Sequence, residues 1–163
     1  MSLPRGTDYN LTVQNPSTAF SDPDLKCCEV ETDPLGLPKA YSGGFVTAYH
    51  LSSNSKDWAV RCFIKDVPEI QQRYLAIGRL LANSSETFFT KAHYVPQGII
   101  VNGKWYPIIK MVWLKGEPLN AYINNNISNA TILKNLLTEF TDMVHRLEKL
   151  GIAHGDLQHG NII

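Results

Sequence analysis

The residues best suited to catalysis lie in one short stretch near the end of the chain, His154-Gly155-Asp156-Leu157-Gln158-His159-Gly160-Asn161. Transfer of a phosphoryl group needs a carboxylate that accepts the proton of the attacking hydroxyl. It also needs oxygen ligands for Mg²⁺, which carboxylate and amide groups supply better than sulfur or imidazole. Asp156 and Asn161 are separated by a short loop, so their side chains can converge on one centre. The alternative interpretation is a turn rich in Asx residues with no chemistry.

Two helices are expected around this chemistry. The longer one runs from about Ala130 to Leu150, where apolar residues recur at three- and four-residue steps and form a stripe that we expect to face the core. Gly151 ends it, because glycine readily adopts the left-handed conformation found after helices. A second helix is expected from Pro68, as its first residue, to near Asn83.

An antiparallel sheet is expected upstream of the long helix. The run from Trp58 to Ile64 alternates, so that Ala59 and Arg61 share the face opposite the large apolar side chains. Asn102-Gly103 lies between two apolar runs and predicts a two-residue hairpin, because both positions need positive φ. Pro107 interrupts the second run, which predicts a sheet edge or a bulge at that point.

Composition narrows the classes of protein. The 163 residues are 44% hydrophobic, with 15 Lys+Arg against 15 Asp+Glu and a net charge of zero. A neutral chain does not bind nucleic acid by bulk positive charge. The sequence has neither an apolar run of the ~20 residues that span a bilayer nor a secretory signal. The 3 cysteines, two of them adjacent, suit a reducing compartment, so a cytoplasmic location is expected.

The first 38 residues differ from the remainder. They carry six acidic and two basic residues, a net charge of −4, and they hold five of the 9 prolines. This segment is expected to be an extended arm that lies along the domain through Leu25, Leu35 and Leu37. A disordered tail is the alternative.

The catalytic stretch resembles the catalytic loop of the protein-kinase superfamily, which reads H-R-D-L-x-x-x-N after a long helix. Here it reads H-G-D-L-Q-H-G-N, and Gly in place of Arg is the form of aminoglycoside and choline phosphotransferases and of some bacterial kinases. Further features follow in family order, from the turn Ser42-Gly43-Gly44-Phe45 to the hinge-like Met111-Val112-Trp113-Leu114-Lys115-Gly116. The resemblance covers about residues 37–163 and is strongest to bacterial serine/threonine-kinase-like proteins.

This resemblance implies an α+β fold. Residues 39–111 would form the kinase-like small lobe, a twisted antiparallel sheet plus one helix. Residues 112–118 would form the hinge, and residues 119–163 the start of the helical large lobe up to the catalytic loop. Residues 1–38 would remain outside as the arm, and the remainder of the large lobe is expected in a longer protein.

The resemblance also implies roles for individual residues. Asp156 would be the catalytic base, Asn161 a Mg²⁺ ligand, and His154 a brace for the loop. The residues implied to bind ATP are Gly43, Gly44, Ala59, Arg61, Met111, Val112 and Leu114. Among them, the two glycines would cover the phosphates, Met111 would lie behind the adenine, and the backbones flanking Trp113 would hydrogen-bond it.

The sequence departs from the family pattern in several places. Tyr41 and Val46 stand where glycines are expected in the flap over the phosphates. Arg61 replaces the strand lysine, and a planar guanidinium is not equivalent to an ammonium. Lys65 shares its face but lies roughly 13 Å further along, too far for the same phosphates without a bulge. The nearest acidic residue that could pair with Arg61 from the helix is Glu69, and helix capping explains Glu69 equally well. No D-F-G-type sequence follows the catalytic loop.

The leading hypothesis is therefore an ATP- and Mg²⁺-dependent phosphotransferase that phosphorylates protein Ser/Thr hydroxyls in its full-length form. A small-molecule kinase of the aminoglycoside or choline type is the second enzyme hypothesis, since the same loop would serve it. A pseudokinase or nucleotide-binding regulatory module is the alternative from another class, and a fragment without independent function is the last. None of these hypotheses involves nucleic acid or a membrane.

Overall fold

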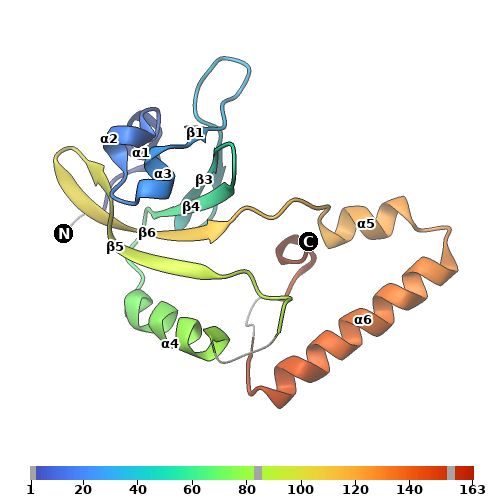
Figure 1. Ribbon diagram of the computed structural model, residues 1–163. Helices are drawn as coiled ribbons and strands as arrows, with labels where there is room; N and C mark the ends of the chain where they lie inside the picture. Colours follow the sequence, from blue (N-terminus) through green and yellow to red (C-terminus); the bar gives the residue numbers. More distant parts are fainter. Residues whose placement is uncertain (1–2, 83–85, 154–156) are drawn as a thin grey trace. The chain divides into compact units, whose positions relative to one another are not determined.

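The computed structural model describes residues 3–82, 86–153 and 157–163 (Figure 1). The chain forms two compact units, residues 1–113 and residues 114–163, which are described separately below. The boundary between them falls within the range 112–118 that was expected to be a hinge. None of the described helices is long and apolar enough to cross a membrane.

The first unit is built on an antiparallel sheet with six strands among the described residues. The strands are β1 (Glu29–Val30), β2 (Ala40–Ser42), β3 (Val46–Ser52), β4 (Asp57–Phe63), β5 (Ala92–Val101) and β6 (Lys104–Val112). Their order is β1-β3-β4-β6-β5, and β2 pairs with β3 beside β1. Helix α4 (Ile70–Ala82) lies between β4 and β5 in the chain. The expected α+β class is therefore confirmed.

One face of the sheet is buried, and the alternation expected for β4 is confirmed. Trp58, Val60 and Cys62 are at most 8% exposed, whereas Ala59 and Arg61 on the other face are half-buried. This alternation sets the register, because a shift by one residue would turn the apolar side chains to the opposite face. The buried face also includes Tyr49, Leu51, Ile99, Val101 and Ile108.

The extended arm expected for residues 1–38 is wrong. The segment folds into α1 (Gly6–Thr12), α2 (Pro16–Ala19) and α3 (Pro23–Lys26), and Pro16 and Pro23 are the first residues of their helices. Proline fits there because its missing N–H has no helical partner to lose. Tyr9, Val13, Phe20 and Leu25 from this segment are fully buried in the same core as the sheet.

The expected contacts of this segment are correct only in part. Leu25 is fully buried, but Leu35 is 84% exposed and Leu37 is 53% exposed. They lie in a turn that Asp33 organises, since its Oδ1 accepts hydrogen bonds from both leucine N–H groups. A long-range bond fixes the helices, with the Tyr9 hydroxyl donating to the carbonyl of Phe63 at 3.0 Å.

The hairpin between β5 and β6 has the expected geometry, with φ of 49° at Asn102 and 75° at Gly103. β6 lies between β4 and β5, but its pairing with β4 ends at Ile108, so Pro107 lies just beyond that ladder. The pairing of β5 with β6 shifts between Val95 and Ile99, opposite Pro107, so the bulge interpretation is confirmed. A proline is tolerated there because the strand pairing is interrupted at the bulge, so no hydrogen bond from an N–H at this position is needed.

Helix α4 starts two residues later than expected, at Ile70 and not at Pro68. Glu69 has a φ of 58°, a left-handed conformation that is uncommon for a residue with a side chain and that precedes the helix. The helix extends to Ala82. The expected end near Asn83 lies at residues outside the described part of the chain.

The second unit contains α5 (Leu119–Asn125), α6 (Ala130–Lys149) and a short 3₁₀ helix (His159–Asn161). The expected long helix is confirmed, with Asn129 capping its start and Gly151 following its end at a φ of 67°. Its apolar stripe is only partly covered in the structure, since Leu147 is buried but Leu137 is 65% exposed.

Candidate functional site

Ala59, Arg61 and Met111, which the resemblance assigns to the nucleotide site, lie together on the less buried face of the sheet. Ala59 on β4 is directly opposite Met111 on β6, and Arg61 is opposite Ala48 and Ile109. Directly opposite residues in an antiparallel pair have Cβ atoms ~5 Å apart. Arg61 follows Ala59 by two residues, so its Cβ is ~7 Å further along the same face. The sheet therefore presents a small residue, a thioether and a cation side by side.

The turn between β2 and β3 contains Gly43 and Gly44 and is tied to the end of β4. The Gly43 N–H donates to the carbonyl of Val46 at 2.8 Å. The carbonyl of Phe45 accepts from the N–H of Ile64 at 3.0 Å. Neither glycine has a positive φ, and a Cβ at Gly44 would have no heavy atom of the described residues within 4 Å apart from its chain neighbours. The fold itself thus gives no steric reason for glycine at position 44.

A second cation, Lys65, lies beside this turn, although the sequence indicated that it is too far along the strand to act with Arg61. The Nζ of Lys65 is 5.6 Å from the centroid of the Phe45 ring, within the range of a cation–π contact. The carbonyl of Phe45 also accepts from the Lys65 N–H at 3.3 Å. The spacing along an extended strand places Lys65 too far from Arg61 for both to contact the same phosphates. The neighbouring strand brings the turn to Lys65, which no local sequence signal reveals.

The hinge-like residues belong to different parts of the structure. Val112 is the last residue of β6, opposite Trp58, and Leu114 is the first residue of the second unit. Between them, the N–H of Trp113 donates to the carbonyl of Asp57 at 2.9 Å. The end of the first unit is therefore fixed to the start of β4.

Trp113 also belongs to an aromatic and polar cluster that the sequence interpretation did not identify. Its ring stacks on His50, with centroids 4.2 Å apart and planes at 20°, and it lies 5.4 Å from the ring of Tyr41. The carboxylate of Glu31 accepts a 2.7 Å bond from Lys39 and a 2.9 Å bond from Tyr41, and it lies 3.1 Å from Nδ1 of His50. The bond from Lys39 is the main cause that lowers the pKa of Glu31.

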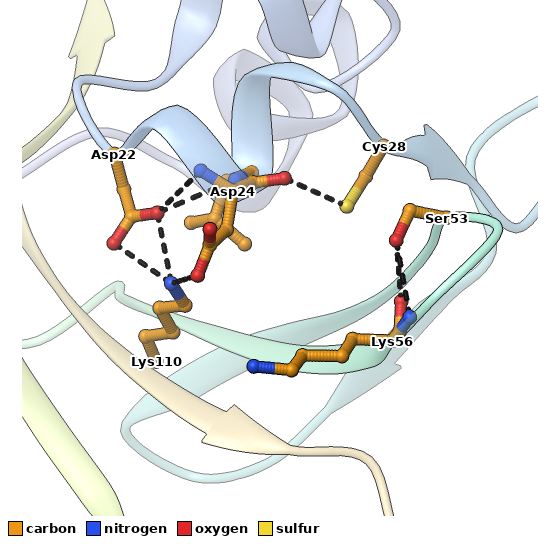
Figure 2. Close-up of polar contacts among 7 residues, drawn as sticks. Asp22, Asp24, Cys28, Ser53, Lys56 and Lys110 are labelled. Carbon is orange, nitrogen blue, oxygen red and sulfur yellow. Dashed lines mark hydrogen bonds and ion pairs between the residues drawn. The ribbon is translucent and has the colours of Figure 1, made fainter.

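A second polar cluster lies on the buried face of the sheet (Figure 2). The Nζ of Lys110, 6% exposed on β6, is 2.8 Å from a carboxylate oxygen of Asp22 and 2.8 Å from one of Asp24. It also lies 4.1 Å from the centroid of the Trp58 ring. Burial favours the neutral amine, but the bonds to the two carboxylates outweigh it and raise the pKa of Lys110. This lysine remains charged and is unsuited to act as a base or nucleophile.

The catalytic stretch is only partly described. His154 and Asp156 lie outside the described residues. Asn161 lies in the short 3₁₀ helix with an exposed side chain, and its N–H donates to the carbonyl of Gln158 at 2.9 Å. In the described ranges, no group of three or more His, Cys, Asp or Glu side chains is placed to hold a metal ion. Of the three residues assigned to the catalytic loop, the structure therefore describes Asn161 alone.

Comparison of the chain with models of protein families, with curated proteins and with solved structures finds no match in any of the three. The functional interpretation therefore depends on the residues of this chain and on their arrangement.

Proposed function

We propose that this chain is the nucleotide-binding part of an ATP-dependent phosphotransferase of the protein-kinase-like type. Arg61 would neutralise phosphate charge, the turn at Gly43 and Gly44 would cover the phosphates, and Asp156 and Asn161 would supply the base and a Mg²⁺ ligand. The hydroxyl that accepts the phosphoryl group would belong to a protein Ser or Thr, with a small-molecule hydroxyl as the second possibility. His154 would brace the catalytic loop.

The observation that carries this proposal is the common face of Ala59, Arg61 and Met111. A flat adenine ring that lies over this face needs a small side chain beneath it, and Ala59 is a small residue paired with Met111 on the next strand. A cation two residues away along the strand suits the phosphates that follow the adenosine. Gly44 lacks a steric reason within the fold, and close approach of a ligand to the backbone is a common reason for glycine.

A nucleotide-binding module without phosphoryl transfer is the second candidate, and helix α4 favours it. In protein kinases a helix glutamate pairs with the strand lysine. The sequence of α4, Ile70–Ala82, contains no acidic residue, and Glu69 precedes the helix in a left-handed conformation. Arg61 on β4 thus has no acidic partner from this helix. A site that lacks this pair can bind nucleotide and still fail to align it for transfer.

Nucleotide binding is tested on the 163-residue chain by its melting temperature with and without ATP and Mg²⁺. A ligand that binds only the folded state raises that temperature as its concentration exceeds the Kd. We expect a rise for the wild type, a smaller rise for Arg61→Ala, and an equal or larger rise for Arg61→Lys. The matched control is Arg73→Ala, which removes the same charge from an exposed position on α4. The absence of any shift at millimolar nucleotide would contradict both candidates.

Transfer is tested separately, on a protein that contains this chain together with a downstream helical lobe. Asp156→Asn removes the proposed base, so transfer of the γ-phosphate should vanish while the nucleotide-induced shift remains. Undiminished transfer in this variant would show that Asp156 is not the base. Binding without transfer in the unsubstituted protein would favour the second candidate.

A further inference from the structure

We propose that Glu31 and His50 are positioning residues that hold Trp113, and with it the backbone of residues 112–114, in the conformation that accepts a nucleotide. This inference rests on the function proposed above, because it concerns the segment expected to hydrogen-bond the adenine. It adds a role for Glu31 and Lys39, which the resemblance does not assign to nucleotide binding.

The contacts form a continuous series from this segment to Trp113. Glu31 follows β1, and its N–H donates to the carbonyl of His50 at 2.9 Å. Its carboxylate lies 3.1 Å from Nδ1 of the same histidine. The His50 ring in turn stacks on Trp113 at 4.2 Å. One acidic residue therefore fixes both the strand and the ring on which the tryptophan rests.

The orientation of the His50 ring is determined by its two nitrogens. An ionised carboxylate only accepts hydrogen bonds, so Nδ1 carries the proton that faces Glu31. Nε2 is buried and has no hydrogen-bond partner among the described residues. Turning the ring would break the bond between Nδ1 and Glu31 and would place the unpartnered Nε2 against the carboxylate.

Glu31 is itself held from two further directions. Lys39 and Tyr41, which lie before and within β2, donate to its two carboxylate oxygens at 2.7 Å and 2.9 Å. The Tyr41 ring also reaches Trp113, with centroids 5.4 Å apart. The tryptophan thus contacts two rings, and both of these rings bond to the carboxylate of Glu31.

The cluster lies next to the residues proposed to contact the nucleotide. His50 is directly opposite Ala59 on β4, and Ala59 is opposite Met111 on β6. The backbone of Trp113 is fixed by its bond to Asp57 on the same strand. A change in the tryptophan ring therefore acts on a backbone that follows Met111 by two residues. If this segment is already held in place, less conformational entropy is lost when the nucleotide binds, so the affinity is higher.

The test uses a chain in which Trp113 is the only tryptophan, made by Trp58→Phe and Trp105→Phe. Its fluorescence emission reports the tryptophan environment, and ATP·Mg²⁺ affinity is measured in parallel. We expect Glu31→Ala and His50→Ala to shift the emission to longer wavelength and to weaken ATP·Mg²⁺ binding about tenfold. His50→Gln, whose amide can donate to Glu31, should restore most of both properties.

The matched control is His93→Ala, which removes an exposed strand histidine outside the cluster and should change neither property. An emission shift without weaker ATP·Mg²⁺ binding would overturn the inference. Unchanged emission in the alanine variants would overturn it too. Both results would leave the proposed function intact. A parent chain that binds no ATP·Mg²⁺ would overturn the proposed function and this inference together. Urea unfolding of each variant identifies any that fail to fold. If the alanine variants do not fold, the conclusion rests on His50→Gln and Glu31→Gln. We expect Glu31→Gln to weaken ATP·Mg²⁺ binding, because it removes the negative charge that bonds to His50.

Discussion

The ammonium group of Lys110 donates a 2.8 Å hydrogen bond to the carboxylate of Asp22, a residue 88 positions earlier in the chain. Asp22 also caps α3, because its Oδ1, which accepts the bond from Lys110, also accepts a hydrogen bond from the N–H of Asp24 at 2.9 Å. The pair therefore joins the start of a helix to an interior strand of the sheet. It also offsets part of the negative charge of the first 38 residues with a base from the remainder of the chain.

Removing either partner of this pair should destabilise the first unit. Asp22→Ala removes the cap and leaves the Lys110 ammonium with Asp24 alone, and we expect a loss of about 3 kcal/mol in the free energy of unfolding. Lys110→Met should cost about 2 kcal/mol, because it leaves two neighbouring carboxylates without their cation. Urea unfolding followed by tryptophan fluorescence measures both losses in the first unit, since Trp58, Trp105 and Trp113 all lie there.

Asp24→Ala is the control for this pair. Its side chain is 57% exposed and caps no helix, so its loss should cost less than that of Asp22. A larger loss for Asp24→Ala than for Asp22→Ala would mean that the cap and the buried bond contribute little.

Stability should decrease in acid through Asp24. The bond from Lys110 is the main cause that lowers the pKa of this carboxyl below its ordinary value. A lowered pKa in the folded state stabilises the fold above the unfolded pKa of about 4, and this contribution is lost as the pH falls through the folded value. The melting temperature of Asp24→Asn should therefore lie below that of the wild type at neutral pH and approach it in acid. A difference that stays constant with pH would contradict this assignment.

Gly98 should not tolerate a side chain. It lies in the bulge of β5, and a Cβ at this position would overlap the Ile108 side chain. We expect Gly98→Ala to cost about 1–3 kcal/mol through overpacking. Gly44→Ala is the matched control, because its Cβ would contact no heavy atom of the described residues and its φ is not positive. Equal losses of stability in urea would show that the bulge accommodates the methyl group.

The three cysteines should react very differently with a thiol reagent. Cys27 is exposed, whereas Cys28 and Cys62 are buried, and burial raises the pKa of both buried thiols. Because the thiolate is the reactive form, the folded chain should show one fast thiol, which Cys27→Ser removes. In denaturant all 3 should react. A second fast thiol in the folded chain would indicate that the core opens readily near Cys28 or Cys62.

Features that depend on neighbours in the chain were predicted well. The alternation of Trp58, Val60 and Cys62 specified the buried face of β4, and Asn102-Gly103 specified the hairpin, because both signals reside in a few adjacent residues. The stripe before Gly151 likewise predicted α6. The strand, the hairpin and the helix were predictable because each depends on the backbone conformation of residues that are close together in the sequence.

Features that depend on distant partners were not predicted. The acids and prolines of the first 38 residues indicated an extended arm, because nothing local shows that the Tyr9 hydroxyl bonds to Phe63. The same holds for Glu31, whose link to Trp113 passes through a histidine on another strand. In the candidate site, the common face of Ala59 and Arg61 was predictable from strand alternation, whereas the position of Lys65 beside the turn was not.

The burial of Tyr9, Phe20 and Leu25 under the sheet has a consequence for biosynthesis. These side chains leave the ribosome before the strands that cover them, β3, β4 and β6, which are completed only at Val112. Until then the nascent chain exposes apolar surface that has no partner, and closing contacts over so many residues is slow. Translation of this protein therefore includes an interval in which chaperone binding would protect the growing chain from aggregation.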